Sequence, residues 1–208
     1  MQELRTEGQA GMDASTIVIG GRPRLPNAVL GTLLFIATEV MFFAGLVSAF
    51  LVVKARYLAG WPPPGQPRLP VEITAVNTLV LLASGWLMWS AGRQWENQGS
   101  QSRAALRRAR WAVLLGCVFV SIQGSEWVRL LSFGLTLTSG PYGSFFYLIV
   151  GAHALHAMGA IVVLGALLAR PRGANDDDTA RARFRAARYF WYFVVLVWPV
   201  LYVLVYLA

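Results

Sequence analysis

The chain is patterned as five long apolar runs separated by shorter polar stretches. In the first run, residues 28–53, Glu39 is the only ionisable side chain, and the run exceeds the roughly 20 residues that a helix needs to cross a bilayer. Four further runs meet the same criterion, at residues 73–91, 111–128, 142–169 and 189–208. Because lipid cannot satisfy an open backbone, each run is predicted to form a helix.

These runs predict an all-α fold, a polytopic bundle of five transmembrane helices over residues 28–208, preceded by a polar segment, residues 1–27. The composition agrees, since the chain is 56% hydrophobic and only 13% charged, far from the values of a soluble domain. Residues 1–25 show no secretory signal pattern. Cys117 is the only cysteine, which argues against a disulfide framework or a cysteine-based metal or haem site, and we expect it to be a small packing residue.

The basic residues predict the orientation of the bundle. Fourteen of the 18 lie in the N-terminal segment and in the loops 92–110 and 170–188, which five spans place on one side of the membrane. The four on the other side are Lys54, Arg56, Arg68 and Arg129. The positive-inside rule then puts the N-terminus in the cytoplasm and the C-terminus outside. Anionic headgroups account for the net charge of +8, so no nucleic-acid partner is expected.

Polar side chains inside the spans are the candidate functional residues, because a charge at mid-bilayer costs on the order of 2.5–3.5 kcal/mol. Glu39 lies roughly 17 Å along the first span, and is either a neutral carboxylic acid that bonds a neighbouring helix or a functional, mostly protonated carboxyl. His153 and His156 lie at a similar depth in the fourth span, and their i, i+3 spacing predicts that they share a face. With two histidines and no nearby cysteine, structural or lipid-facing hydrogen bonding is favoured over a metal site.

Two further polar residues lie near the end of the third span. Glu126 precedes Arg129 by three positions, which predicts an interfacial ion pair, and Gln123 lies one turn earlier. Both are interpreted as structural. Small residues predict close helix contacts, with Gly45 in the first span facing the stretch 83–85 in the second.

Several stretches of the chain together resemble subunit III of the haem-copper oxidases, the family that includes subunit III of cytochrome c oxidase. Order and spacing agree from about Leu30 to the C-terminus. The matching stretches are LFIATEVMFFAG at 34–45, WPP at 61–63, NTLVLLASG at 77–85, QGSEW at 123–127, YGSFF at 142–146, GAHALH at 151–156 and FWYFVVLVW at 190–198. No single motif is decisive, but the ordered set is specific.

The resemblance implies a bundle with a lipid-filled cleft and no redox centre of its own, packed on the catalytic subunit I, with haem and copper held by partner subunits. It places Glu39 on the family's carbodiimide-reactive carboxyl, and His156 and Arg170 on phospholipid headgroup contacts. Trp61, an interfacial tryptophan, is a third candidate lipid contact. The implied role is to stabilise the oxidase in the bacterial cytoplasmic membrane and to support its proton uptake. Subunit II and other respiratory subunits are further expected partners.

The sequence departs from the family pattern in its last span. The family commonly has Trp-His-Phe-Val-Asp, whereas this chain has Tyr192 and Val195 at the two polar positions. Longer relatives also have two additional spans before those found here.

Three interpretations remain open. The first is a non-catalytic subunit III of a cytochrome c oxidase, and the second is the equivalent subunit of a quinol oxidase or a nitric oxide reductase accessory protein. The third is a small proton-coupled transporter that uses Glu39 and the histidines. Continuous spans without paired glycine or proline breaks argue against a transporter.

Overall fold

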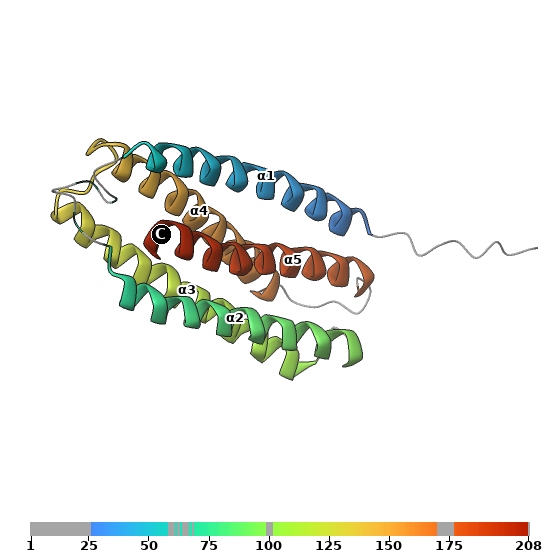
Figure 1. Ribbon diagram of the computed structural model, residues 1–208. Helices are drawn as coiled ribbons and strands as arrows, with labels where there is room; N and C mark the ends of the chain where they lie inside the picture. Colours follow the sequence, from blue (N-terminus) through green and yellow to red (C-terminus); the bar gives the residue numbers. More distant parts are fainter. Residues whose placement is uncertain are drawn as a thin grey trace, which may run out of the picture.

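The computed structural model describes residues 26–57, 61, 63, 67, 69–98, 102–169 and 177–207. Five long helices follow one another along the chain: α1 (Asn27–Ala55), α2 (Val71–Gln98), α3 (Arg103–Ser132), α4 (Pro141–Ala169) and α5 (Asp177–Tyr202), which continues into a π-helical turn, η1 (Val203–Leu207) (Figure 1). Each is long and apolar enough to cross a membrane. The prediction of an all-α bundle with five transmembrane helices is confirmed.

The fifth helix begins earlier than its apolar run, at Asp177 rather than near residue 189. Its first turns are amphipathic, with Phe184 and Ala187 buried while Arg181 and Arg183 are exposed. An amphipathic segment of this kind is stabilised by packing its apolar face against other helices. A search for apolar runs finds only the membrane-crossing part of such a helix.

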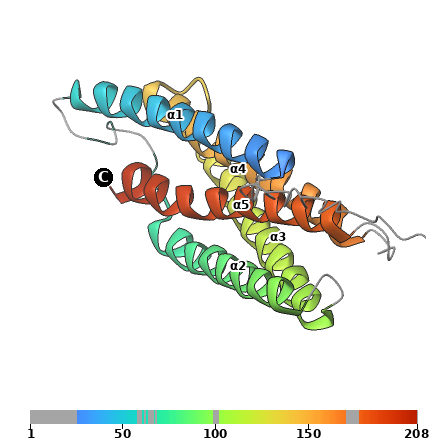
Figure 2. The ribbon, with the colours of Figure 1, turned by 90° about the vertical axis from the view of Figure 1, so that its right-hand side faces the viewer.

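Helix α5 occupies the middle of the bundle (Figures 1 and 2). It packs against α1 and α4 on one side and α2 on the other, while α2 and α3 form an antiparallel hairpin with extensive contacts. In both views α1 lies on the far side of α5 from α2. Helix α1 is therefore held by α5 and α4, at the edge of the bundle.

Buried tryptophans and small residues hold α2, α3 and α5 together. Trp191 and Trp198 of α5 are fully buried, and their indole N–H groups donate to the hydroxyls of Ser84 (3.1 Å) and Thr78 (2.9 Å) on α2. A Cβ at Gly116 of α3 would collide with the Trp191 ring, so that glycine makes room for the indole. These contacts bury both large rings with their polar atoms satisfied.

Two expectations about small residues in the spans are wrong. Gly85 does not face Gly45: a Cβ at Gly85 would lie 2.8 Å from Val195 Cγ1 on α5, and none of the described residues comes within 4 Å of one at Gly45. Since α5 separates α1 from α2, the small residues of α2 meet α5. Cys117 is exposed on α3 rather than packed.

Candidate functional site

The structure brings Glu39 and His156 together near the middle of the bundle. Glu39 is the thirteenth of the 29 residues of α1, and His156 is the sixteenth of the 29 residues of α4. Their side chains meet through Oε2 and Nε2 at 2.9 Å, and expose only 17% and 14% of their surface. Two residues 117 positions apart therefore form a partly buried acid–base pair at mid-membrane depth.

A second hydrogen bond places a proton on Nδ1 of His156. Its Nδ1 lies 2.6 Å from the carbonyl oxygen of Ala152, one turn earlier in α4. A carbonyl oxygen only accepts, so Nδ1 carries a proton and donates it. One proton is then left for the Nε2–Oε2 contact. Either the neutral Glu39 acid donates to Nε2, or the imidazolium donates to the carboxylate, and in both forms the pair holds one shared proton.

Aromatic rings surround this pair. The Phe43 ring of α1 lies 5.4 Å from the His156 ring, and Phe190 and Phe193 of α5 lie at 6.2 and 6.3 Å. These rings replace water around the pair with apolar surface. In such surroundings a hydrogen bond between polar groups is stronger, and leaving either partner unpaired is more costly, than in water.

The other histidine is more deeply buried, although both imidazole rings lie near the Phe43 ring of α1, at 6.5 Å for His153 and 5.4 Å for His156. His153 is almost completely buried, with its ring 4.9 Å from that of Trp198 and 6.3 Å from that of Phe119. Its Nε2 has no hydrogen-bond partner within the described part of the chain. His153 thus packs among rings of α3 and α5, whereas His156 makes its hydrogen bond to Glu39 of α1. Nowhere in the described residues do three or more His, Cys, Asp or Glu side chains gather closely enough to hold a metal ion.

Of the two contacts made by polar residues of α3, the ion pair of Glu126 with Arg129 was predicted from their spacing and the contact of Gln123 was not. Arg129 Nη1 donates to Glu126 Oε1 at 3.2 Å, with Arg129 exposed and Glu126 buried. Gln123 Nε2 donates to the hydroxyl of Tyr206 at 2.9 Å. The first contact lies within the last two turns of α3, and the second joins α3 to η1.

The remaining candidate lipid contacts are less defined. Trp61 packs edge-on against the rings of Phe50, Tyr57 and Tyr142, each 5.2–5.6 Å away. It therefore joins the ends of α1 and α4 through aromatic packing. Arg170 lies outside the described residues.

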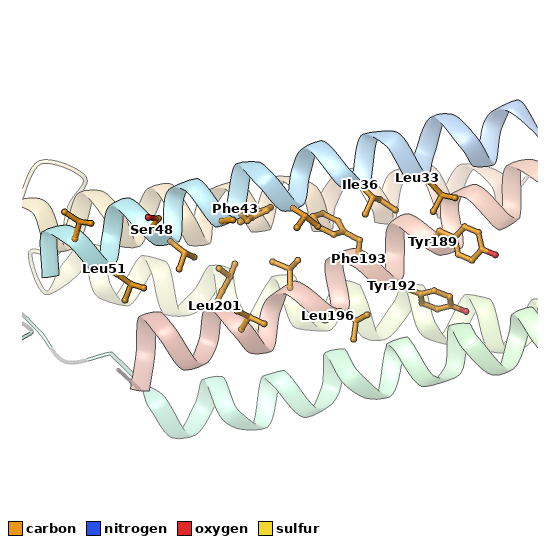
Figure 3. Close-up of a pocket in the computed structure, with 16 residues that line it drawn as sticks. Leu33, Ile36, Phe43, Ser48, Leu51, Tyr189, Tyr192, Phe193, Leu196 and Leu201 are labelled. Carbon is orange, nitrogen blue, oxygen red and sulfur yellow. The ribbon is translucent and has the colours of Figure 1, made fainter. Parts of the chain in front are cut away.

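An apolar groove of about 870 Å³ runs between α1 and α5 (Figure 3). Leu33, Ile36 and Phe43 on α1 face Phe193 and Leu196 on α5 across it. Its lining extends along α1 from Leu33 to Val52, which is roughly 28 Å at 1.5 Å per residue. That length approaches the roughly 30 Å thickness of the bilayer hydrocarbon.

Sequence reasoning missed one ion pair, in which the arginine is buried and the glutamate is exposed. Arg188 Nη2 of α5 donates to Glu96 Oε1 of α2 at 2.7 Å, and Arg188 is only 7% exposed. Both residues lie next to apolar runs that end on the same predicted side of the membrane. Opposite charges on one side of a bundle favour an ion pair. The partner choice depends on α5 packing beside α2, which the sequence pattern did not specify.

Fold and site together define a class: a multi-pass helical membrane protein with a carboxyl–imidazole pair inside the bundle. The family model described as cytochrome c oxidase subunit III matches residues 24–208. The chain belongs to the cytochrome c oxidase subunit III family, and is thus an accessory subunit of a multi-subunit oxidase of the respiratory chain.

Both bacterial and mammalian relatives are similar to the chain. It is 33% identical to a probable cytochrome c oxidase subunit 3 of Mycobacterium leprae over 87% of this chain and 88% of that protein. It is 37% identical to cytochrome c oxidase subunit 3 of Pongo abelii over 85% of this chain and 67% of that protein. A relative in Nocardia farcinica is 31% identical, over 87% of this chain and 88% of that protein.

Proposed function

We propose that this chain supports a terminal haem-copper oxidase, with cytochrome c as the electron donor, in the bacterial cytoplasmic membrane. It packs mainly on subunit I, with subunit II as a further partner, and those partners hold the haem and copper. Its N-terminus lies in the cytoplasm. Its role is to stabilise subunit I and to support proton uptake, and the Glu39–His156 pair is the observation that carries this role.

The pair suits proton support because it holds one proton between two groups of different chemistry. The hydrogen bond to Ala152 keeps Nδ1 occupied, so proton exchange is confined to Nε2 and the Glu39 carboxyl. Aromatic rings exclude water around His156, and the two side chains keep a small exposed surface through which a proton can enter or leave. The pair thus binds one exchangeable proton close to the catalytic subunit.

Removal of the chain tests the supporting role. An oxidase purified without it should keep its haem content and most of its initial oxygen-reducing turnover, because the redox centres lie in other subunits. Its active lifetime during turnover should shorten. Immediate and complete loss of turnover in an otherwise intact subunit I would contradict a supporting role.

Carbodiimide labelling tests the assignment of Glu39. Carbodiimides react with protonated carboxyl groups in apolar surroundings, so Glu39 should carry the label in the purified complex. Glu39→Ala should abolish labelling, whereas Glu126→Gln should leave it unchanged, because Glu126 is paired with the cation of Arg129. Equal labelling of the Glu39→Ala complex would assign the reactivity to another residue.

We also propose that a phospholipid acyl chain occupies the α1–α5 groove. Its apolar lining and its length support this assignment, and the hydroxyls of Tyr189 and Tyr192 provide polar groups near one end (Figure 3). Leu196→Trp should fill the groove and lower the phospholipid content of the purified complex. Leu155→Trp, on an exposed position of α4 outside the groove, is the matched control. Unchanged lipid content in Leu196→Trp would refute this occupant.

A further inference from the structure

A small cavity lies at the arginine-rich end of the bundle, where α2 ends and α5 begins. Its volume is about 140 Å³. It is lined by Trp95, Glu96, Arg181, Phe184, Arg185 and Arg188. None of these residues lines the α1–α5 groove or contacts the Glu39–His156 pair, so the cavity is a separate feature of the molecule.

The charges around this cavity favour an anion. Three arginines and one glutamate line it. The single carboxylate is already engaged, because Glu96 accepts a hydrogen bond from Arg188 Nη2 at 2.7 Å. Guanidinium groups present several N–H donors in a planar fork that matches the oxygens of phosphate and carboxylate groups.

Arg188 is positioned in advance for such a ligand. The residue is 93% buried, and its Nε has no hydrogen-bond partner among the described residues, although buried donors are nearly always paired. Glu96 holds one arm of its guanidinium, and a Cβ at Gly92 of α2 would collide with the group. The side chain is therefore fixed between α2 and α5, where it forms part of the cavity wall.

Size and depth narrow the kind of anion. A cavity of about 140 Å³ exceeds the roughly 30 Å³ that one water occupies in the liquid, and is smaller than the roughly 300–1,000 Å³ of sites for drug-sized ligands. It therefore suits a single phosphate group rather than a nucleotide. Trp95 and Phe184, stacked at 4.2 Å, give it an aromatic wall. The apolar run of α5 begins at Tyr189, so Arg188 lies at headgroup depth.

We propose that this cavity binds a phosphate group, with Arg185 and Arg188 as its principal ligands. The phosphate oxygens accept hydrogen bonds from the two guanidinium groups. Glu96 orients Arg188 and, through its own charge, limits the affinity. A membrane phospholipid and free inorganic phosphate both present this chemistry.

Two variants test the site in the purified oxidase complex: one removes a positive charge from the cavity, and the other removes a negative charge. Native mass spectrometry would count adducts with phosphatidylglycerol, with diacylglycerol of the same chains, and with inorganic phosphate alone. Arg185→Gln should weaken the phosphate-dependent adduct roughly tenfold, the effect of losing one charge-assisted hydrogen bond. Glu96→Gln should strengthen it, because a like charge is removed while an amide oxygen can still accept from Arg188. If Glu96 only held Arg188 in place, Glu96→Gln would not strengthen phosphate binding.

The control is Arg93→Gln, which removes an exposed arginine at the same end of α2 that does not line the cavity. It should leave the adduct unchanged. An Arg185-dependent adduct with phosphatidylglycerol alone identifies a lipid headgroup, and one with inorganic phosphate identifies the free ion. Equal loss in Arg93→Gln, equal binding of diacylglycerol, or no gain in Glu96→Gln would overturn the proposal. Haem content confirms that each complex is assembled, and Glu96→Gln keeps the test decisive if Arg185→Gln fails to assemble.

Discussion

Helices α2, α3 and α5 are joined in a different way from α1 and its neighbours. In the first region, tryptophans of α5 fit beside small residues and donate hydrogen bonds to hydroxyls of α2. In the second, α1 meets α5 across an apolar groove and is tied to α4 by the Glu39–His156 contact. Many side chains of α1 are exposed, among them Met41 at 74%.

The difference lies in what each region does: α2, α3 and α5 hold one another by close packing, whereas α1 contributes to the candidate functional site. In lipid, helices associate through close packing and interhelical hydrogen bonds rather than through the hydrophobic effect. The α2–α3–α5 region has both, in its indole–hydroxyl bonds and in the close fit of Gly116 beside Trp191. Helix α1 carries instead one half of a titratable pair and one wall of an apolar groove.

The largest expected contrast between the two regions comes from adding one methyl group. Gly116→Ala should destabilise the purified chain by about 1–3 kcal/mol, because its Cβ overlaps the buried Trp191 ring. Gly45→Ala in α1 should change stability by less than about 0.5 kcal/mol, since none of the described residues comes within 4 Å of the added atom. Unfolding in mixed micelles of increasing denaturing detergent measures both. Equal losses of stability in the two variants would contradict the difference in packing between the two regions.

A smaller contrast concerns threonine hydroxyls. Thr78→Val leaves the Trp198 indole N–H without its acceptor and should cost about 0.6–1.7 kcal/mol, the range of such bonds inside membrane proteins. Thr38→Val should have little effect, because that exposed hydroxyl donates only to the Phe35 carbonyl of its own helix. The same unfolding assay compares them. A larger loss in Thr38→Val would show that α1 depends on polar contacts that this account does not include.

The fold was largely predictable because bilayer thickness sets the length of each apolar run. The depth of Glu39 and His156 was predictable for the same reason, since helical rise converts residue number into distance. Their pairing was not, because it depends on how α1 and α4 are rotated about their axes, and uniformly apolar helices contain little information on rotation. The ion pair between Arg188 and Glu96 escaped prediction for a related reason: it depends on which helices are neighbours.

A double-mutant comparison of Glu39 and His156 tests the central claim most directly. Oxidase complexes carrying Glu39→Gln, His156→Gln and both changes would be compared with wild type for initial turnover and for the number of turnovers before inactivation. If the two residues hold one proton as a unit, either single change shortens the active lifetime, and the double change shortens it no further, with initial turnover retained. Effects that multiply in the double variant, or single variants with wild-type lifetimes, would contradict the claim.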